Sequence, residues 1–152
     1  MPIRSWSLED LPQISKLLSE LSHSIGFHYH NNPDLLKKHY LLTEAYPDFY
    51  STFIYIDSNT VAGMISMVFY SSALHRKGTA LINELIVAPG YRSKGIGTQL
   101  LTPCVDLAKK RGFDEIEVGV EKANTTAAAF YRRNGIDKEY ILLGKEFLET
   151  GE

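Results

Sequence analysis

Apolar positions in the first third of the chain recur every three or four residues, which is the spacing of one face of an α-helix. They predict a first helix from Leu8 to about Ser22. Ser7 and Asp10 stand three positions apart at its start, as in an N-cap pair. A second helical pattern begins at Pro33. Two helices are therefore expected before residue 50.

From residue 50 onward, most apolar runs are short and strand-sized, and turn residues separate them. Strands are predicted over residues 3–5, 52–56, 61–70, 80–87, 115–120 and 139–147. The helical spacing returns twice, over Gly95–Arg111 and Thr125–Asn134. This order is typical of an α/β (α+β) fold, with a central mixed sheet flanked by helices. We expect a single domain over residues 1–152.

Composition narrows the function classes. The chain has 16 Lys and Arg against 18 Asp and Glu, and the basic residues do not gather into one stripe, so nucleic-acid binding is not expected. No apolar run approaches the ~20 residues that cross a bilayer. The N-terminus also lacks the layout of a signal peptide. We therefore expect no membrane partner and a cytoplasmic location. Cys104, the single cysteine, is interpreted as a core residue.

The turn-rich segment Tyr91–Gly97 lies between a predicted buried strand and a helix. Free backbone N–H groups and the helix dipole hold phosphates at such places. A Walker loop would need Lys and then Ser or Thr after Gly95, and a dinucleotide fingerprint would need glycine where Leu100 stands. Neither fits. The segment Arg92–Gly97 does match R-x-x-G-x-G.

A second motif, N-x-x-A-x-x-F-Y-x-x-x-G, runs from Asn124 to Gly135. Together the two motifs resemble the coenzyme A signature and the second motif of the GNAT superfamily of N-acetyltransferases. The likeness is strong over residues 80–147, whereas residues 1–79 match only in the order of elements. It implies a GNAT-like acyl-CoA N-acyltransferase fold that uses acetyl-coenzyme A. The cofactor-binding core would span about residues 80–135, with acceptor-site elements mainly in 1–79.

The resemblance also implies which residues bind the cofactor. Backbone N–H groups around Leu85–Val87 would stabilise the oxyanion of the reaction. Asn124 matches a cofactor-contacting amide, with a helix N-cap as its alternative. The full predicted cofactor set is Leu85, Ile86, Val87, Arg92, Ser93, Lys94, Gly95, Ile96, Gly97, Thr98, Asn124 and Tyr131.

Two side chains are candidate catalytic groups. An alkyl amine is almost fully protonated at pH 7, so attack on a thioester needs a proton acceptor. Strand alternation puts Glu84 between Ile82 and Ile86 on one face, where desolvation would raise its pKa. A solvated glutamate is the alternative, and a β-bulge, common here in the family, would change the face. Tyr131 matches the family's thiolate proton donor, with packing beside Phe130 as its alternative.

The acceptor remains open at this point. Phe27, Tyr29 and His30 are predicted to line an acceptor pocket. A metal at His28 and His30 is not favoured, because no acidic or cysteine partner has ligand spacing, so no metal site is expected. The predicted function is direct acetyl transfer to a small-molecule or peptide amine in a ternary complex. The alternatives are a coenzyme A-binding regulator and a protein lysine or N-terminal acetyltransferase. A homodimer is left open.

Overall fold

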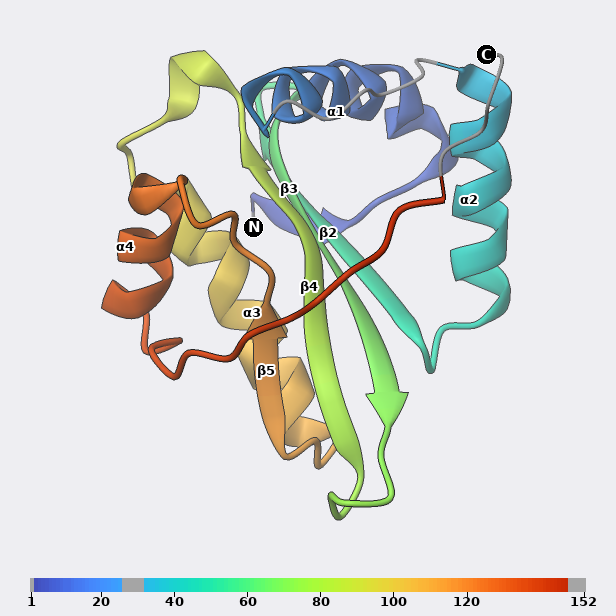
Figure 1. Cartoon of the computed structure of the whole chain (residues 1–152). Coiled ribbons are helices and arrows are strands. Elements are labelled where there is room, and N and C mark those ends of the chain that lie inside the picture. Colours follow the sequence, from blue (N-terminus) through green and yellow to red (C-terminus); the bar gives the residue numbers. More distant parts are fainter. Residues whose placement is uncertain (1, 26–31, 148–152) are drawn as a thin grey trace.

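A five-stranded sheet with helices on both faces makes up the fold (Figure 1). The computed structural model describes residues 2–25 and 32–147. Its strands are β1 (Ile3–Ser5), β2 (Tyr50–Asp57), β3 (Thr60–Ser71), β4 (Gly78–Val87) and β5 (Glu115–Val118). Its α-helices are α1 (Leu11–Ile25), α2 (Pro33–Ala45), α3 (Ile96–Lys110) and α4 (Thr125–Arg133), and short 3-10 turns cover Leu8–Asp10 and Pro89–Tyr91. The predicted mixed α/β sheet is confirmed.

The strands lie in chain order, and only the last pair is parallel. That parallel pairing is short, because β5 matches β4 from Thr79 to Ile82 and then ends. Beyond Ile82, β4 continues to Val87 with β3 as its partner. We call Thr79–Ile82 the paired end of β4 and Glu84–Val87 its open end. The sheet therefore has a free inner edge along the open end.

A β-bulge separates the two ends of β4. Ser66 of β3 lies opposite Glu84, and the next residue, Met67, lies opposite Ile82, so Asn83 has no partner in the ladder. An unpaired extra residue resets the alternation of side chains along the strand. The side chains of the open end consequently lie on different faces from those that simple counting assigns.

Two hydrophobic clusters cover the two faces of the sheet. Packed between the sheet and α3, the first contains Phe69, Ile82, Leu100 and Cys104. In the second, Trp6, Ile14, Leu36, Ile54 and Ile86 join α1 and α2 to the opposite face. The core role predicted for Cys104 fits its position, and burial raises the pKa of its thiol to about 12. Each face of the sheet thus has its own helical layer.

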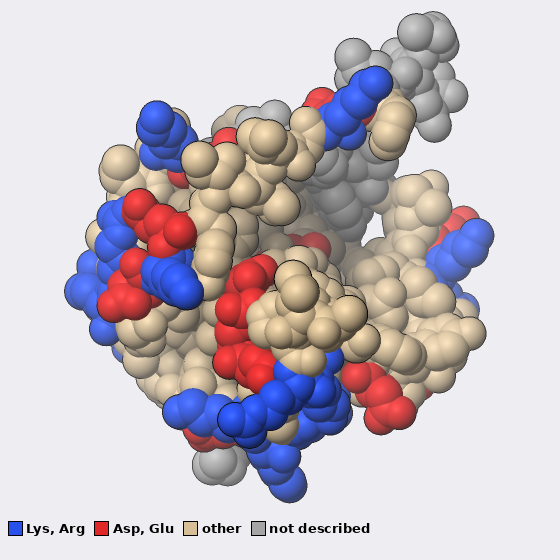
Figure 2. Space-filling model, turned by 60° about the horizontal axis from the view of Figure 1, so that its bottom comes forward, with Lys and Arg blue, Asp and Glu red and all other residues tan. Residues whose placement is uncertain are grey.

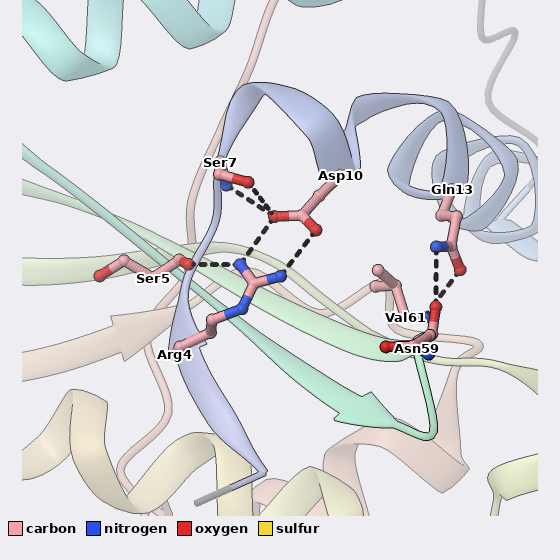
Figure 3. Close-up of polar contacts among 7 residues, drawn as sticks. All are labelled: Arg4, Ser5, Ser7, Asp10, Gln13, Asn59 and Val61. Carbon is pink, nitrogen blue, oxygen red and sulfur yellow. Dashed lines mark hydrogen bonds and ion pairs between the residues drawn. The ribbon is translucent and has the colours of Figure 1, made fainter.

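Polar contacts fasten the start of α1 to the sheet (Figure 3). Asp10 accepts a hydrogen bond from the Ser7 N–H at 2.7 Å, as the predicted N-cap pair requires, and a further one from the Ser7 hydroxyl at 2.9 Å. Arg4 adds a two-pronged ion pair with Asp10, at 2.8 and 2.9 Å. This arginine holds the pKa of the Asp10 carboxyl below its usual value. Gln13 then ties α1 to the start of β3 by accepting a hydrogen bond from the Val61 N–H, at 2.8 Å.

The predicted last strand is wrong. Residues 139–147 lie in the described part of the chain and form no strand there. Ile141, Leu142, Leu143 and Phe147 are each 88–89% exposed. In Figure 1 the segment crosses in front of β5 and β4 toward α2 instead of running alongside β5. Strand-forming side chains do not make a strand without a partner edge.

Within the described residues, no helix has the length and apolar content needed to span a bilayer.

Candidate functional site

A cavity of about 770 Å³ opens where β4 and β5 part. Three elements line it: the open end of β4, the turn that leads into α3, and the segment from the end of β5 into α4. From the predicted cofactor set, the lining includes Leu85, Val87, Arg92, Ser93, Gly95, Ile96, Gly97, Thr98, Asn124 and Tyr131. Both sequence motifs therefore face one space.

In the described part of the chain, the backbone of the open end has donors toward this space that no strand pairs with. The Ala88 N–H donates to the Ala62 carbonyl of the β3 side at 2.8 Å. Because backbone groups alternate along a strand, Ile86 shares that direction and is used for pairing, whereas Leu85 and Val87 point the opposite way. The Arg92 Nε donates to the Val87 carbonyl at 3.0 Å, which confirms that direction. Leu85 and Val87 are thus the residues whose N–H groups are available to a ligand.

The turn before α3 has the backbone shape of an anion cradle. Ser93 has φ 62° and Gly95 has φ 78°, both in the left-handed region, and Gly95 is the N-cap of α3. A Cβ at Gly95 would meet nothing nearer than a Gln99 side-chain nitrogen at 4.0 Å. Glycine is favoured there by its backbone angle and not by lack of space. The turn presents the N–H groups of a 15-residue helix to the cavity.

Gly97 has a different role, because it joins the two motifs. A Cβ at this position would lie 3.1 Å from two ring carbons of Phe130. The ring of the second motif therefore packs directly on the glycine of the first. Asn124 caps the N-terminus of α4, where its side chain accepts a hydrogen bond from the Ala127 N–H at 3.1 Å. The N-cap alternative is therefore confirmed for this side chain. These contacts fix the distance between the two walls of the cavity.

Tyr131 lies inside the cavity wall and is only 8% exposed. Its ring contacts Phe130 edge to face, with the centroids 5.2 Å apart, so the packing role is real. Desolvation raises the pKa of its hydroxyl to about 12. No hydrogen bond joins that hydroxyl to another described residue. The phenol is thus protonated at neutral pH, and its hydroxyl is not committed to a partner.

Glu84 lies on the face of the sheet opposite the cavity, and of its two predicted neighbours Ile86 is right and Ile82 is wrong. Ile82 belongs to the α3 cluster and Ile86 to the α1–α2 cluster, so the two isoleucines lie on opposite faces. The bulge at Asn83 is the reason, and it leaves Glu84 on the Ile86 face. The Ser66 hydroxyl, directly opposite on β3, donates to a Glu84 carboxylate oxygen. Glu84 is half-buried.

The remaining predicted residues have mixed outcomes. Ile86 does not line the cavity, because its side chain is buried in the α1–α2 cluster and its N–H faces β3. Lys94 is also absent from the lining, and its ammonium lies 5.6 Å from the centre of the Tyr91 ring. Phe27, Tyr29 and His30, predicted to line the acceptor pocket, lie outside the described residues, as does His28.

Several cavity residues were missed from the sequence: Tyr91, Glu121, Ala123, Thr126, Ala127, Phe130 and Arg133. The signal for most of them is helical spacing. Thr126, Phe130 and Arg133 stand four and then three apart, on the same side of α4. One helical step of three residues from Phe130, which the second motif contains, would have found Arg133, a cation that faces the same cavity as Arg92.

Side-chain contacts close the paired end of β4. Asp114 accepts the N–H groups of Lys77 and Gly78, each at 2.9 Å. These donors hold the pKa of the Asp114 carboxyl below its usual value. Thr79 donates to Glu115 at 3.0 Å, which lowers the pKa of that carboxyl. Figure 2 looks toward this end and shows acidic and basic side chains next to one another, not a surface of one sign.

Comparison with known proteins settles the family. The model of the Acetyltransferase (GNAT) family matches residues 12–136. This chain belongs to that family. The match includes both motifs, the whole cavity and Glu84. The family resemblance drawn from the two motifs is therefore confirmed.

Curated relatives are similar to parts of this chain. An uncharacterized N-acetyltransferase of Methanocaldococcus jannaschii is 36% identical over 73 residues, which are 48% of this chain and 32% of that protein. Streptothricin acetyltransferase A of Bacillus subtilis is 31% identical over 84 residues, 55% of this chain and 46% of that protein. N-alpha-acetyltransferase 30 of Schizosaccharomyces pombe is 34% identical over 93 residues, 59% of this chain and 58% of that protein. The matches span less than two thirds of these relatives' lengths.

Solved structures confirm the fold. Glucosamine-6-phosphate N-acetyltransferase from Arabidopsis thaliana superposes with a TM-score of 0.82 at 18% identity, covering 95% of this chain and 97% of that one. An aminoglycoside acetyltransferase from an uncultured soil metagenomic sample gives 0.77 at 21% identity, covering 97% and 95%. At these identities the likeness concerns the fold alone.

Proposed function

We propose that this protein transfers the acetyl group of acetyl-coenzyme A to a primary amine, by direct attack in a ternary complex. The observation that carries the proposal is the cavity at the open end of β4. There the free N–H groups of Leu85 and Val87 and the N-terminus of α3 face the same space as Tyr131. The cytoplasmic location expected from the sequence, the single domain and the homodimer stay predictions.

The lining fits coenzyme A. A pyrophosphate needs close backbone donors and positive charge, and the Ser93–Gly97 turn with Arg92 and Arg133 offers both. The apolar walls around Leu85 and Phe130 suit the uncharged arm of the cofactor. When bound, acetyl-coenzyme A supplies an acetyl group activated as a thioester. The N–H groups of Leu85 and Val87 would then donate to a carbonyl oxygen that gains negative charge.

Glu84 is the proposed proton acceptor for the amine. Its side chain lies on the α1–α2 face, whereas Leu85, the next residue, lines the cavity on the other side of the sheet. The two substrates would therefore approach the free edge of β4 from opposite faces and meet there. The arrangement supports direct transfer, because an amine on the Glu84 side reaches the edge without entering the cofactor cavity.

Tyr131 is the proposed proton donor to the departing thiolate. Burial keeps its hydroxyl protonated at neutral pH, as an acid requires. With no hydrogen bond to another described residue, this hydroxyl can turn toward a sulfur atom in the cavity. The protein's own part in the reaction is thus to hold one proton at Tyr131 and to accept another at Glu84.

The test has a binding step and a turnover step. Calorimetry should detect coenzyme A binding, and mixing acetyl-coenzyme A with a panel of amines should release free thiol. The panel should contain aminoglycosides, polyamines, free amino acids and peptides. Binding without thiol release from any amine would support a coenzyme A-binding regulator instead. The absence of binding would overturn both functions.

A second candidate is acetylation of protein N-termini, which the likeness to N-alpha-acetyltransferase 30 favours. In the panel it predicts that peptides with a free N-terminus are acetylated. The same peptides with a blocked N-terminus and a free lysine should then be left unchanged. The reverse pattern would indicate lysine acetylation, and turnover only with small amines would exclude both.

A further inference from the structure

We infer that Ser66 is a positioning residue for the reaction and that its hydroxyl holds the Glu84 carboxylate in place on the acceptor side of the sheet. The inference rests on the proposed function, in which Glu84 accepts the proton of the amine. It assigns a task to a buried polar residue outside both sequence motifs.

Strand register brings the two side chains together. Ser66 and Glu84 are direct partners across β3 and β4, at the last pair before the bulge. Directly opposite residues of an antiparallel pair have Cβ atoms about 4.5–5.5 Å apart and share a face. A serine side chain spans this gap, and its hydroxyl donates to the carboxylate. The bulge at Asn83 is what places Glu84 opposite this serine.

The Ser66 hydroxyl is buried and therefore depends on its hydrogen bond with Glu84. Ser66 is 7% exposed and lies in a strand whose residues 61–67 are all buried. A hydroxyl at such a position needs a hydrogen-bond partner, and the structure gives it a Glu84 oxygen. On the same face, Thr52 of β2 pairs with Ser66 and is equally buried. The carboxylate is therefore held from the sheet side and leaves its other oxygen available for an amine.

Other titratable groups on the packed elements do not take this role. They are Lys16, Glu20 and His23 on α1, Asp34, Lys37, Lys38, His39, Tyr40 and Glu44 on α2, Tyr50, Tyr55 and Asp57 on β2, Tyr70 on β3, and Glu115 and Glu117 on β5. Within the described residues, none of them forms a hydrogen bond or ion pair with Glu84. They are also unchanged in a Ser66 variant, so a difference between variant and wild type reports on Ser66.

Thr79 offers a matched control. It is 1% exposed and donates its hydroxyl to Glu115 at 3.0 Å, so it repeats the pairing of a buried hydroxyl with a glutamate. It lies on the same strand as Glu84, but at the paired end, roughly 16 Å away by strand rise. Thr79→Val and Ser66→Ala each remove one such bond, and only Ser66→Ala removes it from Glu84.

The first readout needs no turnover. The Glu84 carboxyl carbon is observed by ¹³C NMR at pH 7, with its signal assigned by its loss in Glu84→Gln. The Ser66 hydroxyl donates to this carboxylate, so removing the hydroxyl changes the electronic surroundings of the carboxyl carbon. Ser66→Ala should shift the signal, Thr79→Val should leave it in place, and Ser66→Thr should return it to the wild-type position. If Ser66→Ala does not fold, Ser66→Cys keeps the volume with a weaker donor.

The second readout is thiol release. Ser66→Ala should lower kcat/KM for the amine about tenfold, Ser66→Thr should restore it, and Thr79→Val should leave it unchanged. An unmoved Glu84 carboxyl signal would overturn the Ser66 contact itself. A moved signal with unchanged kcat/KM would show that Ser66 holds a carboxylate that is not the base. Full activity in Glu84→Gln would overturn the base assignment and, with it, the positioning role. A wild-type protein without turnover on any amine would sink the proposed function, while the NMR signal would still decide whether Ser66 holds Glu84.

Discussion

The two ends of β4 use the same backbone in opposite ways. At the paired end, β3 and β5 flank the strand, and Asp114 and Thr79 add side-chain bonds to the closure. At the open end, β5 has already stopped, and among residues 2–25 and 32–147 no strand pairs with the N–H groups of Leu85 and Val87. The comparison shows how a sheet can provide a binding edge and stay folded. The strand pairing at the paired end of β4 holds the open end in position.

The largest effect expected at the open end is on turnover. Tyr131→Phe keeps the ring that packs on Phe130 and removes the proposed acid. Thiol release should fall about 10²- to 10⁴-fold where chemistry limits the rate. The matched control is Tyr70→Phe, which removes a hydroxyl bonded to Glu117 at the paired end and should leave turnover intact. Equal rates for wild type and Tyr131→Phe would leave Tyr131 as a packing residue.

Coenzyme A should stabilise the fold and protect the two ends unequally. At a ligand concentration one hundred times Kd, the free energy of unfolding should rise by about 2.7 kcal/mol. In hydrogen exchange, the Leu85 and Val87 amides should change from fast to protected, whereas the Ala80 amide, between two strands, should be slow throughout. No thermal shift at saturating ligand would count against the cofactor, and uniform protection would count against the free edge.

A smaller effect is expected where the two motifs touch. Gly97→Ala places a Cβ against the Phe130 ring and should push α4 outward. We expect coenzyme A to bind about tenfold more weakly, since overpacking costs about 1–3 kcal/mol. Gly90→Ala is the control, because a Cβ there meets nothing within 4 Å. If Phe130→Leu in the Gly97→Ala background fails to recover affinity, the ring contact is not the cause.

The smallest effect is a pH dependence at the paired end. The Asp114 carboxyl has a pKa below its usual value because the Lys77 and Gly78 N–H groups donate to it. Its contribution to stability is therefore complete above about pH 4 and is lost as the pH falls through the lowered pKa. Asp114→Ala should lower the urea midpoint at pH 7, and the difference from wild type should shrink toward pH 2. A constant difference at both pH values would contradict this contact.

The sequence predicted the local features well, because each depends on a few neighbouring residues. The N-cap at Ser7, the helix that follows Gly95 and the turn before that helix all follow from neighbouring residues. The contact between Gly97 and Phe130 was missed, since no spacing rule joins residues 33 positions apart. The family motifs nevertheless named both residues.

Longer-range features were predicted less well. The strand over 139–147 was wrong because strand formation depends on a partner edge, and side chains such as Ile141 express only a preference. Ile82 was wrongly predicted to share the face of Glu84, because a bulge arises from the pairing of two strands and not from one strand alone. Ser66 was overlooked for the same reason. Its contact with Glu84 depends on the strand register, which places the two residues opposite each other.

The bulge at Asn83 also has a consequence for insertions and deletions. Asn83 has no partner on β3, so it does not take part in the one-to-one pairing of the two strands. A protein lacking only Asn83 would keep Glu84 facing α1 and Leu85 facing the cavity, because the two strands would then pair one to one. Deleting Leu85 instead would move the side chain of every later residue of the strand to the opposite face of the sheet. Within a few residues, the same strand therefore contains a position that tolerates a change of length and positions that do not.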